Sequence, residues 1–413
     1  MRAARFVFFL LLAAIPIQFG KHFWPSFSFV HGIRIDYLSP TLHVTDLIVV
    51  ALILLSINGL YREAFKFFTS KLFILTVIVI LVGCTFAVEK TAALFGLIKF
   101  LEFSYVAFFV SKVFSVKDRD VSVYLLTLGG VVTTIILSFQ FILQSSLGGV
   151  FYYLGERTFS VATPGIATFH FLGQLVLRPY ATFPHPNVTS FFLLLPITLL
   201  LFAHFRRDSI IYYFKAIALI VLSFGVCLTF SRIALLFLAL IFMGRFLPAG
   251  LFRRIIWVAV IVVFFLIVIT RLETGILQDI GYRIQLIETS FQIFLRNPII
   301  GVGLQNFFYH EVDFQNRITP VLFQPVHNIY LYWMAMTGIA GGVVLGLFLL
   351  KLYKRLRMLV ATKSRFARAS VLLALFILFA GLFDHYFLTL QQGQLVTAIV
   401  LGLVFSKQTK DLE

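Results

Sequence analysis

Twelve apolar runs divide the chain, and they constrain its fold more than any other feature. A helix needs about 20 apolar residues to cross the hydrocarbon core of a bilayer. Only 12% of the residues are charged, whereas soluble domains carry roughly 25%. We therefore expect an all-α polytopic membrane protein with about twelve transmembrane helices. The runs are 6–19, 44–60, 72–88, 92–115, 121–147, 188–204, 210–230, 233–244, 255–270, 326–350, 369–385 and 391–405.

Lys and Arg lie mostly on one side of the predicted membrane, and this sets the orientation. If the N-terminus is inside, the inner segments hold 21 of the 34 Lys and Arg residues. The opposite orientation would break the positive-inside rule. We expect both termini in the cytoplasm, with the first run a span and not a signal peptide. The inner segments are 1–5, 61–71, 116–120, 205–209, 245–254, 351–368 and 406–413.

The formal net charge of +17 is mostly this topology signal. In a soluble protein it would suggest nucleic acid, but here the basic residues border the spans and face anionic inner-leaflet lipid. We expect the lipid bilayer as a partner and no nucleic acid. Cys84 and Cys227 lie in apolar runs without metal-ligand spacing. Nothing in the sequence therefore predicts a metal site or a cofactor.

Two long outer segments, 148–187 and 271–325, interrupt the spans. Loops of this length are usually functional or disordered. Both contain aromatic residues and turn-forming Pro and Gly, so we expect them to be ordered parts of a single transmembrane domain covering 1–413.

Part of the second outer segment has the pattern of an amphipathic helix. Residues 282–296 place four apolar side chains at 3-4-3 spacing, and Asn297-Pro298 ends the pattern. A second short helix is expected near Leu304 to His310. The four apolar residues are Ile284, Ile287, Phe291 and Phe294.

Three outer arginines are candidates for chemistry, because charged groups at a membrane boundary are costly and tend to be functional. Arg178 lies in a proline-rich stretch, Arg232 follows a tight turn, and Arg283 begins the amphipathic helix. Each also fits a simpler role as an interfacial anchor, a snorkelling side chain or a solvated residue. His185 and Asn187 are candidates for supporting roles near Arg178.

His327 lies at the outer start of the tenth span, followed by Asn328. Histidine can act as a base near neutral pH. The first amides of a helix lack intrahelical partners and suit a phosphate, so we expect an anion site here, with Asn328 in support. The alternative is a histidine of the interfacial aromatic belt beside Tyr330 and Trp333.

Two other polar pairs have simpler interpretations. Lys99 and Glu102 are three residues apart in the fourth run and can form an ion pair on one helix face. Asp384 and His385 end the eleventh run. They either border a functional site or are ordinary polar residues at the end of a helix.

Taken together, four ordered stretches resemble the family of O-antigen ligases and O-antigen polymerases. The resemblance covers roughly 178–345, and the first 170 residues match only in hydropathy. The family often has Gly at the position of Ala181, where an unusual backbone angle would favour it. The stretches are Arg178 with Thr182-Phe183-Pro184-His185-Pro186-Asn187, Phe230-Ser231-Arg232, Asn297-Pro298-Ile299-Ile300-Gly301-Val302-Gly303, and His327-Asn328-Ile329-Tyr330-Leu331 with Thr337-Gly338-Ile339-Ala340-Gly341.

The resemblance implies a bacterial inner-membrane glycosyltransferase that is metal-independent and inverting. Such an enzyme transfers a glycan from undecaprenyl pyrophosphate to an acceptor hydroxyl on the extracytoplasmic face. The acceptor is lipid A-core for a ligase, the next glycan repeat for a polymerase, and another hydroxyl acceptor in related members. By this resemblance His327 is the catalytic base, and Arg178, Arg232 and Arg283 bind the diphosphate.

Two other functions remain open. A transporter or flippase of lipid-linked glycan also fits twelve spans, and ionisable residues facing one another at the membrane midplane would favour it. A related peptidoglycan polymerase would have about ten spans and different motifs.

Overall fold

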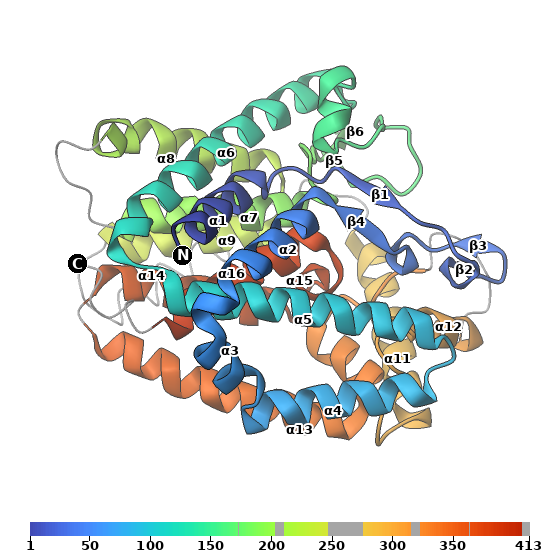
Figure 1. The fold of residues 1–413 in the computed structure, drawn as a ribbon. Coiled ribbons are helices and arrows are strands. Elements are labelled where there is room, and N and C mark those ends of the chain that lie inside the picture. Colours follow the sequence, from blue (N-terminus) through green and yellow to red (C-terminus); the bar gives the residue numbers. More distant parts are fainter. Residues whose placement is uncertain (172, 203–209, 247–275, 315–322, 363, 407–413) are drawn as a thin grey trace.

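The computed structural model describes residues 1–171, 173–202, 210–246, 276–314, 323–362 and 364–406, and it is mostly helical (Figure 1). The helices are α1 (Arg2–Ala14), α2 (Val44–Ser56), α3 (Tyr61–Phe68), α4 (Lys71–Phe86), α5 (Lys90–Val113), α6 (Val116–Leu143), α7 (Pro186–Phe202), α8 (Ile210–Leu228), α9 (Arg232–Phe246), α11 (Ile276–Arg296), α12 (Phe307–Glu311), α13 (Ile329–Ala361), α14 (Arg365–Ala380), α15 (Tyr386–Thr389) and α16 (Gln391–Phe405).

Each predicted apolar run within the described residues contains one of these helices; the run 255–270 lies outside them. By length and composition, α5, α6 and α13 can each cross a membrane, and a fourth span results if α2 and residues 58–68, bent by 60°, count as one. Four shorter helices, α4, α7, α8 and α16, are also apolar. The multi-pass character is supported, and the total of about twelve spans stays a prediction.

The described strands form short antiparallel pairs between the predicted spans. β1 to β4 lie in residues 20–43, and β5 and β6 lie in the first long outer segment, 148–187. β1 (Gly20–His22) pairs with β4 (Thr41–His43), β2 (Phe29–Val30) with β3 (Ile33–Arg34), and β5 (Thr168–Phe171) with β6 (Gln174–Leu177). The β2–β3 turn is His31-Gly32, with φ of +49° and +78°, and two positive angles suit a two-residue hairpin. The all-α expectation therefore holds for the helical body but not for these outer segments.

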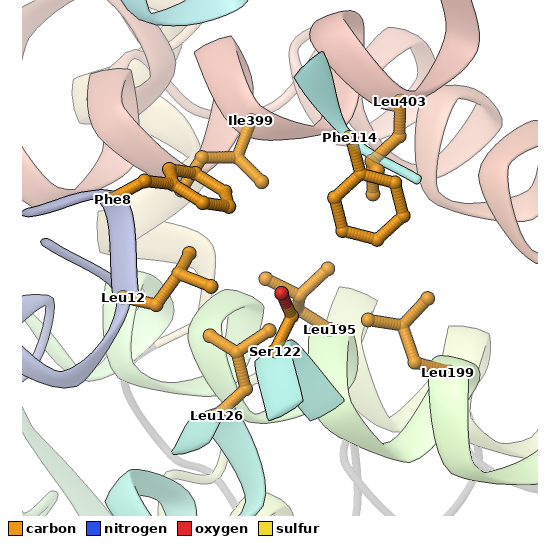
Figure 2. Close-up of a pocket in the computed structure, with 9 residues that line it drawn as sticks. All are labelled: Phe8, Leu12, Phe114, Ser122, Leu126, Leu195, Leu199, Ile399 and Leu403. Atoms are coloured by element: carbon orange, nitrogen blue, oxygen red, sulfur yellow. The ribbon is translucent and has the colours of Figure 1, made fainter. Parts of the chain in front are cut away.

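Helix α7 lies at the centre of the described core. Its residues are apolar on all sides, and almost all of them are buried. A helix that is apolar on all sides needs an apolar environment, either a protein core or a membrane. The helices that pack against α7 are α6, α8, α9, α14 and α16. Figure 2 shows the residues around a cavity beside α7. The volume of this cavity is about 10 Å³, room for about one water, so the packing here is close. Its lining is Phe8, Leu12, Phe114, Ser122, Leu126, Leu195, Leu199, Ile399 and Leu403.

The second outer segment contains the two predicted helices, α11 and α12, at the expected places. The predicted apolar face of α11 is exposed: Ile284 is 50% exposed and Phe291 is 51% exposed. The face that packs inward instead carries Leu286 and Ile293. The amphipathic pattern therefore leaves an apolar stripe on the surface of the helix.

The turn after α11 is inserted into a break in α13. Gly338 has φ of +61° and interrupts that helix. A Cβ on Gly301 or on Gly338 would lie 2.4 Å from opposing backbone atoms, so both positions require glycine. Backbone hydrogen bonds join the turn and the helix on both sides of the break. They run from Val302 N–H to the Ala335 carbonyl at 3.1 Å, Gly303 N–H to Met336 at 2.9 Å, Ile339 N–H to Pro298 at 2.7 Å and Ala340 N–H to Ile299 at 3.1 Å.

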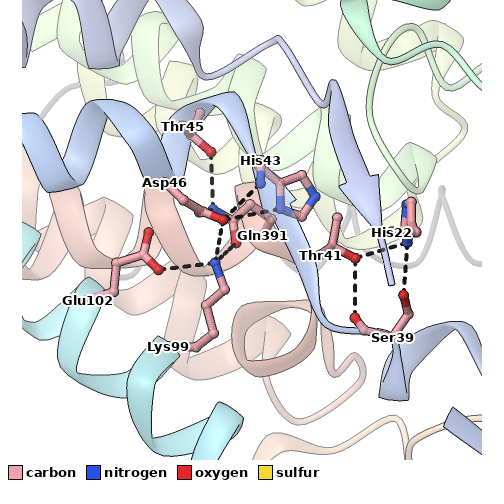
Figure 3. Close-up of polar contacts among 9 residues, drawn as sticks. All are labelled: His22, Ser39, Thr41, His43, Thr45, Asp46, Lys99, Glu102 and Gln391. Atoms are coloured by element: carbon pink, nitrogen blue, oxygen red, sulfur yellow. Dashed lines mark hydrogen bonds and ion pairs between the residues drawn. The ribbon is translucent and has the colours of Figure 1, made fainter. Parts of the chain in front are cut away.

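A buried charge network joins α2, α5 and α16 (Figure 3). The Lys99 ammonium lies 2.8 Å from an Asp46 carboxylate oxygen and 3.0 Å from a Glu102 carboxylate oxygen. It also donates to the Gln391 side-chain oxygen at 3.2 Å, and the Gln391 amide donates to Asp46. The predicted Lys99–Glu102 pair is confirmed, and Asp46 extends it to a second helix and Gln391 to a third.

We expect Lys99→Met to destabilise the protein strongly. It would leave two buried carboxylates without their cation, a change that typically costs about 3–5 kcal/mol. The measurement is the thermal unfolding midpoint in lipid nanodiscs. Lys90→Met, at an exposed position of the same helix, is the control. Equal midpoints for the two variants would contradict a stabilising role for the network.

Candidate active site

Hydrogen bonds bring distant sequence motifs together around Arg178. Its guanidinium donates to the Thr229 carbonyl at 3.1 Å and to the Asn187 side-chain oxygen at 2.7 Å. The Asn187 amide then donates to an Asp384 carboxylate oxygen at 2.6 Å. Asn187 therefore links Arg178 to the segment that follows α14.

Asp384 also contacts His327, the predicted base. Its other carboxylate oxygen lies 3.7 Å from His327 Nδ1 and accepts the His385 backbone N–H at 2.8 Å. Within the described residues His327 Nδ1 is buried and makes no hydrogen bond. Burial alone would raise the pKa of Asp384, but its contact with His327 holds that pKa well below its usual range. Asp384 is therefore ionised and can orient the imidazole.

The other two predicted arginines, Arg232 and Arg283, act electrostatically on Arg178. Burial lowers the pKa of Arg178 to about 10, and the positive charges of Arg232 and Arg283 contribute. Arg178 still carries its charge at neutral pH. Arg283 donates to the Phe383 carbonyl at 3.0 Å, so α11 contacts the residue before Asp384. Arg178 and Arg283 are thus both linked to the segment that contains Asp384, and Arg232 is close enough to act on Arg178.

His185 has a structural place in the site. Its Nδ1 accepts the Asn187 backbone N–H at 3.1 Å. Burial lowers its pKa to about 3, and the charge of Arg178 contributes, while Asp384 opposes the shift. A histidine that stays neutral across the physiological range can hold Asn187 in place without adding charge.

Asn328 caps α13 and does not leave amides for an anion. Its side-chain oxygen accepts the N–H groups of Tyr330 and Leu331, both at 3.0 Å. The Ile329 N–H is taken by the Gly381 carbonyl at 2.8 Å. The expectation that these first amides bind phosphate is therefore wrong, because the cap and the neighbouring segment use them.

Several residues near the site were not singled out from the sequence. The ring of Tyr37 packs edge-on against His385 at 5.5 Å between centroids. His385 in turn lies 5.0 Å from the His327 ring. Tyr37 comes from the outer segment 20–43, between α1 and α2, where no motif marks it. The sequence left Asp384 and His385 open between the border of a site and an ordinary helix end.

The geometry of His327, Asp384 and His385 would also permit a metal ion, since one ligand atom from each lies within 4.8 Å of the others. The electrostatics oppose it, because the positive charge of Arg283 acts on His385 and His185, and that of Arg178 acts on His185. A divalent cation would add to that repulsion. An anion fits this set of groups better.

Ala181 holds the backbone angle that glycine would favour. Its φ is +52°, in the left-handed region, which costs roughly 1–2 kcal/mol for a residue with a Cβ. The buried Gln140 secures the turn: its oxygen accepts the Ala181 N–H at 2.8 Å, and its amide donates to the Ala181 carbonyl at 3.0 Å. The chain therefore adopts a left-handed backbone angle at this position with alanine in place of glycine.

We expect Ala181→Gly to leave the thermal unfolding midpoint close to wild type. Relief of the left-handed strain offsets the greater chain entropy of glycine and the lost methyl. Ala369→Gly, a buried position inside α14, is the matched control and should lower stability by about 1 kcal/mol or more. Equal losses in both variants would show that the angle at Ala181 carries no strain.

The comparisons with known proteins agree with the motifs. The family model described as O-antigen ligase matches residues 217–346. That range includes Arg232, Arg283 and His327, although its residues 247–275 and 315–322 lie outside the described part of the chain. No curated protein matches the sequence. The match confirms the resemblance and implies glycosyl transfer of the O-antigen ligase or polymerase type.

Proposed function

We propose that the protein transfers a glycan from undecaprenyl pyrophosphate to an acceptor hydroxyl, because residues 217–346 match the family model described as O-antigen ligase. The observation that carries the proposal is the hydrogen-bonded chain from Arg178 through Asn187 to Asp384, which contacts His327. It joins an anion-binding group to a potential base. Transfer from a diphosphate needs both groups in one site.

The diphosphate is the leaving group, and its charge grows as the bond to the anomeric carbon breaks. Arg178, Arg232 and Arg283 would neutralise that charge, since a guanidinium binds phosphate oxygens in bidentate fashion. Preorganised donors of this kind are worth a few kcal/mol in the transition state. The arginines can supply this stabilisation themselves, which supports a metal-independent reaction.

His327 would take the proton of the acceptor hydroxyl as its oxygen attacks the anomeric carbon. One carbon–oxygen bond forms as the bond to the diphosphate breaks, so a single displacement inverts the configuration. Asp384 holds the imidazole and stabilises the imidazolium that results. His327 lies at the start of α13, where Asn328 and the Gly381 carbonyl fix the first turn.

The lipid part of the donor also has a plausible contact surface. The exposed stripe of α11 includes Ile280, Ile284, Ile287 and Phe291. Arg283 lies on the same helix and contacts the site. We assign this stripe to the polyprenyl chain of the donor, so that α11 binds the chain and its diphosphate together.

The proposal places the protein in the bacterial inner membrane, with about twelve spans, both termini in the cytoplasm and the site on the extracytoplasmic face. The partners are the undecaprenyl-pyrophosphate-linked glycan, the bilayer and an acceptor. Ligase and polymerase share these groups, so the acceptor is lipid A-core, a glycan repeat or another hydroxyl.

The alternative, a transporter or flippase of lipid-linked glycan, has one observation in its favour. Asp46, Lys99 and Glu102 form an ionisable cluster between two predicted spans. Such clusters mark translocation paths in many transporters. Asp46 lies in the first turn of α2, however, and the arginines and His327 gather at a separate site.

We expect His327→Ala to abolish glycan transfer while donor binding persists. The reconstituted enzyme would receive mixed undecaprenyl-pyrophosphate glycans in the presence of EDTA. Elongated donor would identify a polymerase, and glycan on added lipid A-core a ligase. His310→Ala, a half-buried histidine of α12, is the control. Translocation of the donor without transfer by wild type would instead establish the flippase function.

Arg178→Lys should impair the reaction almost as much as Arg178→Gln. Lysine keeps the charge but not the forked geometry that joins Thr229, Asn187 and the diphosphate. We expect kcat/KM to fall by about 10²–10³. Arg296→Gln, which removes a surface pair with Asp313, is the matched control. Near-normal activity of Arg178→Lys would show that charge alone suffices.

A further inference from the structure

A basic groove lies at the junction of α3, α5 and α13. Its volume is about 400 Å³. Three lysines line it, one from each helix: Lys66, Lys112 and Lys351. The remaining lining residues are Glu63, Phe67 and Ser70. None of them takes part in the candidate active site.

The groove and the candidate active site lie at opposite ends of the same two helices. Helix α13 begins next to His327, and beyond its break at Gly338 it continues for 13 positions to Lys351, a helical rise of roughly 20 Å for this part alone. The hydrocarbon core of a bilayer is about 30 Å thick. Helix α5 runs in the same way from the outer side to the groove. At its start the Glu89 backbone N–H donates to the side chain of Asn306 in the second outer segment, and near its end Lys112 lines the groove.

The charge of the groove favours an anion. Three ammonium groups face the single carboxylate of Glu63, which leaves an excess of two positive charges. Within the described part of the chain, none of the three lysines forms an ion pair. Lys351 approaches an aromatic ring instead, 5.7 Å above Phe405. These ammonium groups are all exposed and can reach a ligand in the groove.

Helix α3 adds an apolar component. The segment that contains it is bent by 60° from α2, and its Tyr61 and Phe65 are 63% and 59% exposed. Exposed aromatic residues beside lysines are typical of the boundary between headgroups and acyl chains. A soluble anion would use only the lysines, whereas a lipid would use both features.

We propose that this groove binds the headgroup of an anionic phospholipid of the inner leaflet. The phosphodiester pairs with Lys66, Lys112 and Lys351, and the acyl chains lie beside Phe67 and the exposed aromatics of α3. Basic pockets between spans on the cytoplasmic side bind such headgroups. The proposal does not depend on glycan transfer, because it concerns the other end of the helices.

The test compares the protein in nanodiscs of phosphatidylcholine alone and of phosphatidylcholine with phosphatidylglycerol. Anionic lipid should raise the unfolding midpoint of wild type and be retained in native mass spectra. The triple variant Lys66→Gln, Lys112→Gln and Lys351→Gln should lose both effects. The control variant Arg62→Gln, Lys354→Gln and Arg357→Gln removes the same charge outside the groove and should keep them.

A further variant covers the case in which the triple variant does not fold. Glu63→Gln removes the only carboxylate of the lining, so it should retain phosphatidylglycerol better than wild type. Unchanged or weaker retention would overturn the proposal, as would equal losses in the two triple variants. Equal stabilisation by inorganic phosphate in phosphatidylcholine nanodiscs would show a site for soluble phosphate and would also overturn it.

Discussion

The backbone pairing between the turn 297–303 and the break in α13 positions the rest of the site. Side chains at Gly301 and Gly338 would collide with opposing backbone, so two glycines permit the contact. The pairing ties α11 to the first turns of α13. Arg283 and His327 are therefore held in one substructure, although more than 40 residues of chain separate them.

Charge is the second constraint, and it is organised around Asp384. This carboxylate accepts hydrogen bonds from Asn187 and from the His385 backbone, and it contacts His327. His185 and His385 add no charge, because burial lowers the pKa of each to about 3. The arginines therefore supply the positive charge near Asp384, and an excess of positive charge suits a polyanion.

Much of the helical framework could be predicted from hydropathy. The apolar runs anticipate the helices because crossing a bilayer demands length and apolarity together. The candidate arginines and His327 could be found because charge at a membrane boundary is costly. Lys99 and Glu102 could be paired because their spacing is local. Each of these signals depends on residues close in sequence.

What could not be predicted depends on contacts between distant segments. Tyr37 reaches His385 only through the fold of residues 20–43, where hydropathy carries no such information. Gln140 secures the left-handed turn at Ala181 from a different helix, and no local sequence pattern reveals that contact. The helix start beside His327 looked open to phosphate because its cap and the Gly381 carbonyl come together only in three dimensions.

The break at Gly338 has a mechanical consequence. It divides α13 into a short rod that begins beside His327 and a long rod, and the length and composition of the helix allow it to cross a membrane. The turn 297–303 bonds to both rods at the joint, so the short rod is set by the outer segment. A thinner or thicker bilayer would tilt the long rod, and we expect the spacing between His327 and Arg283 to stay the same.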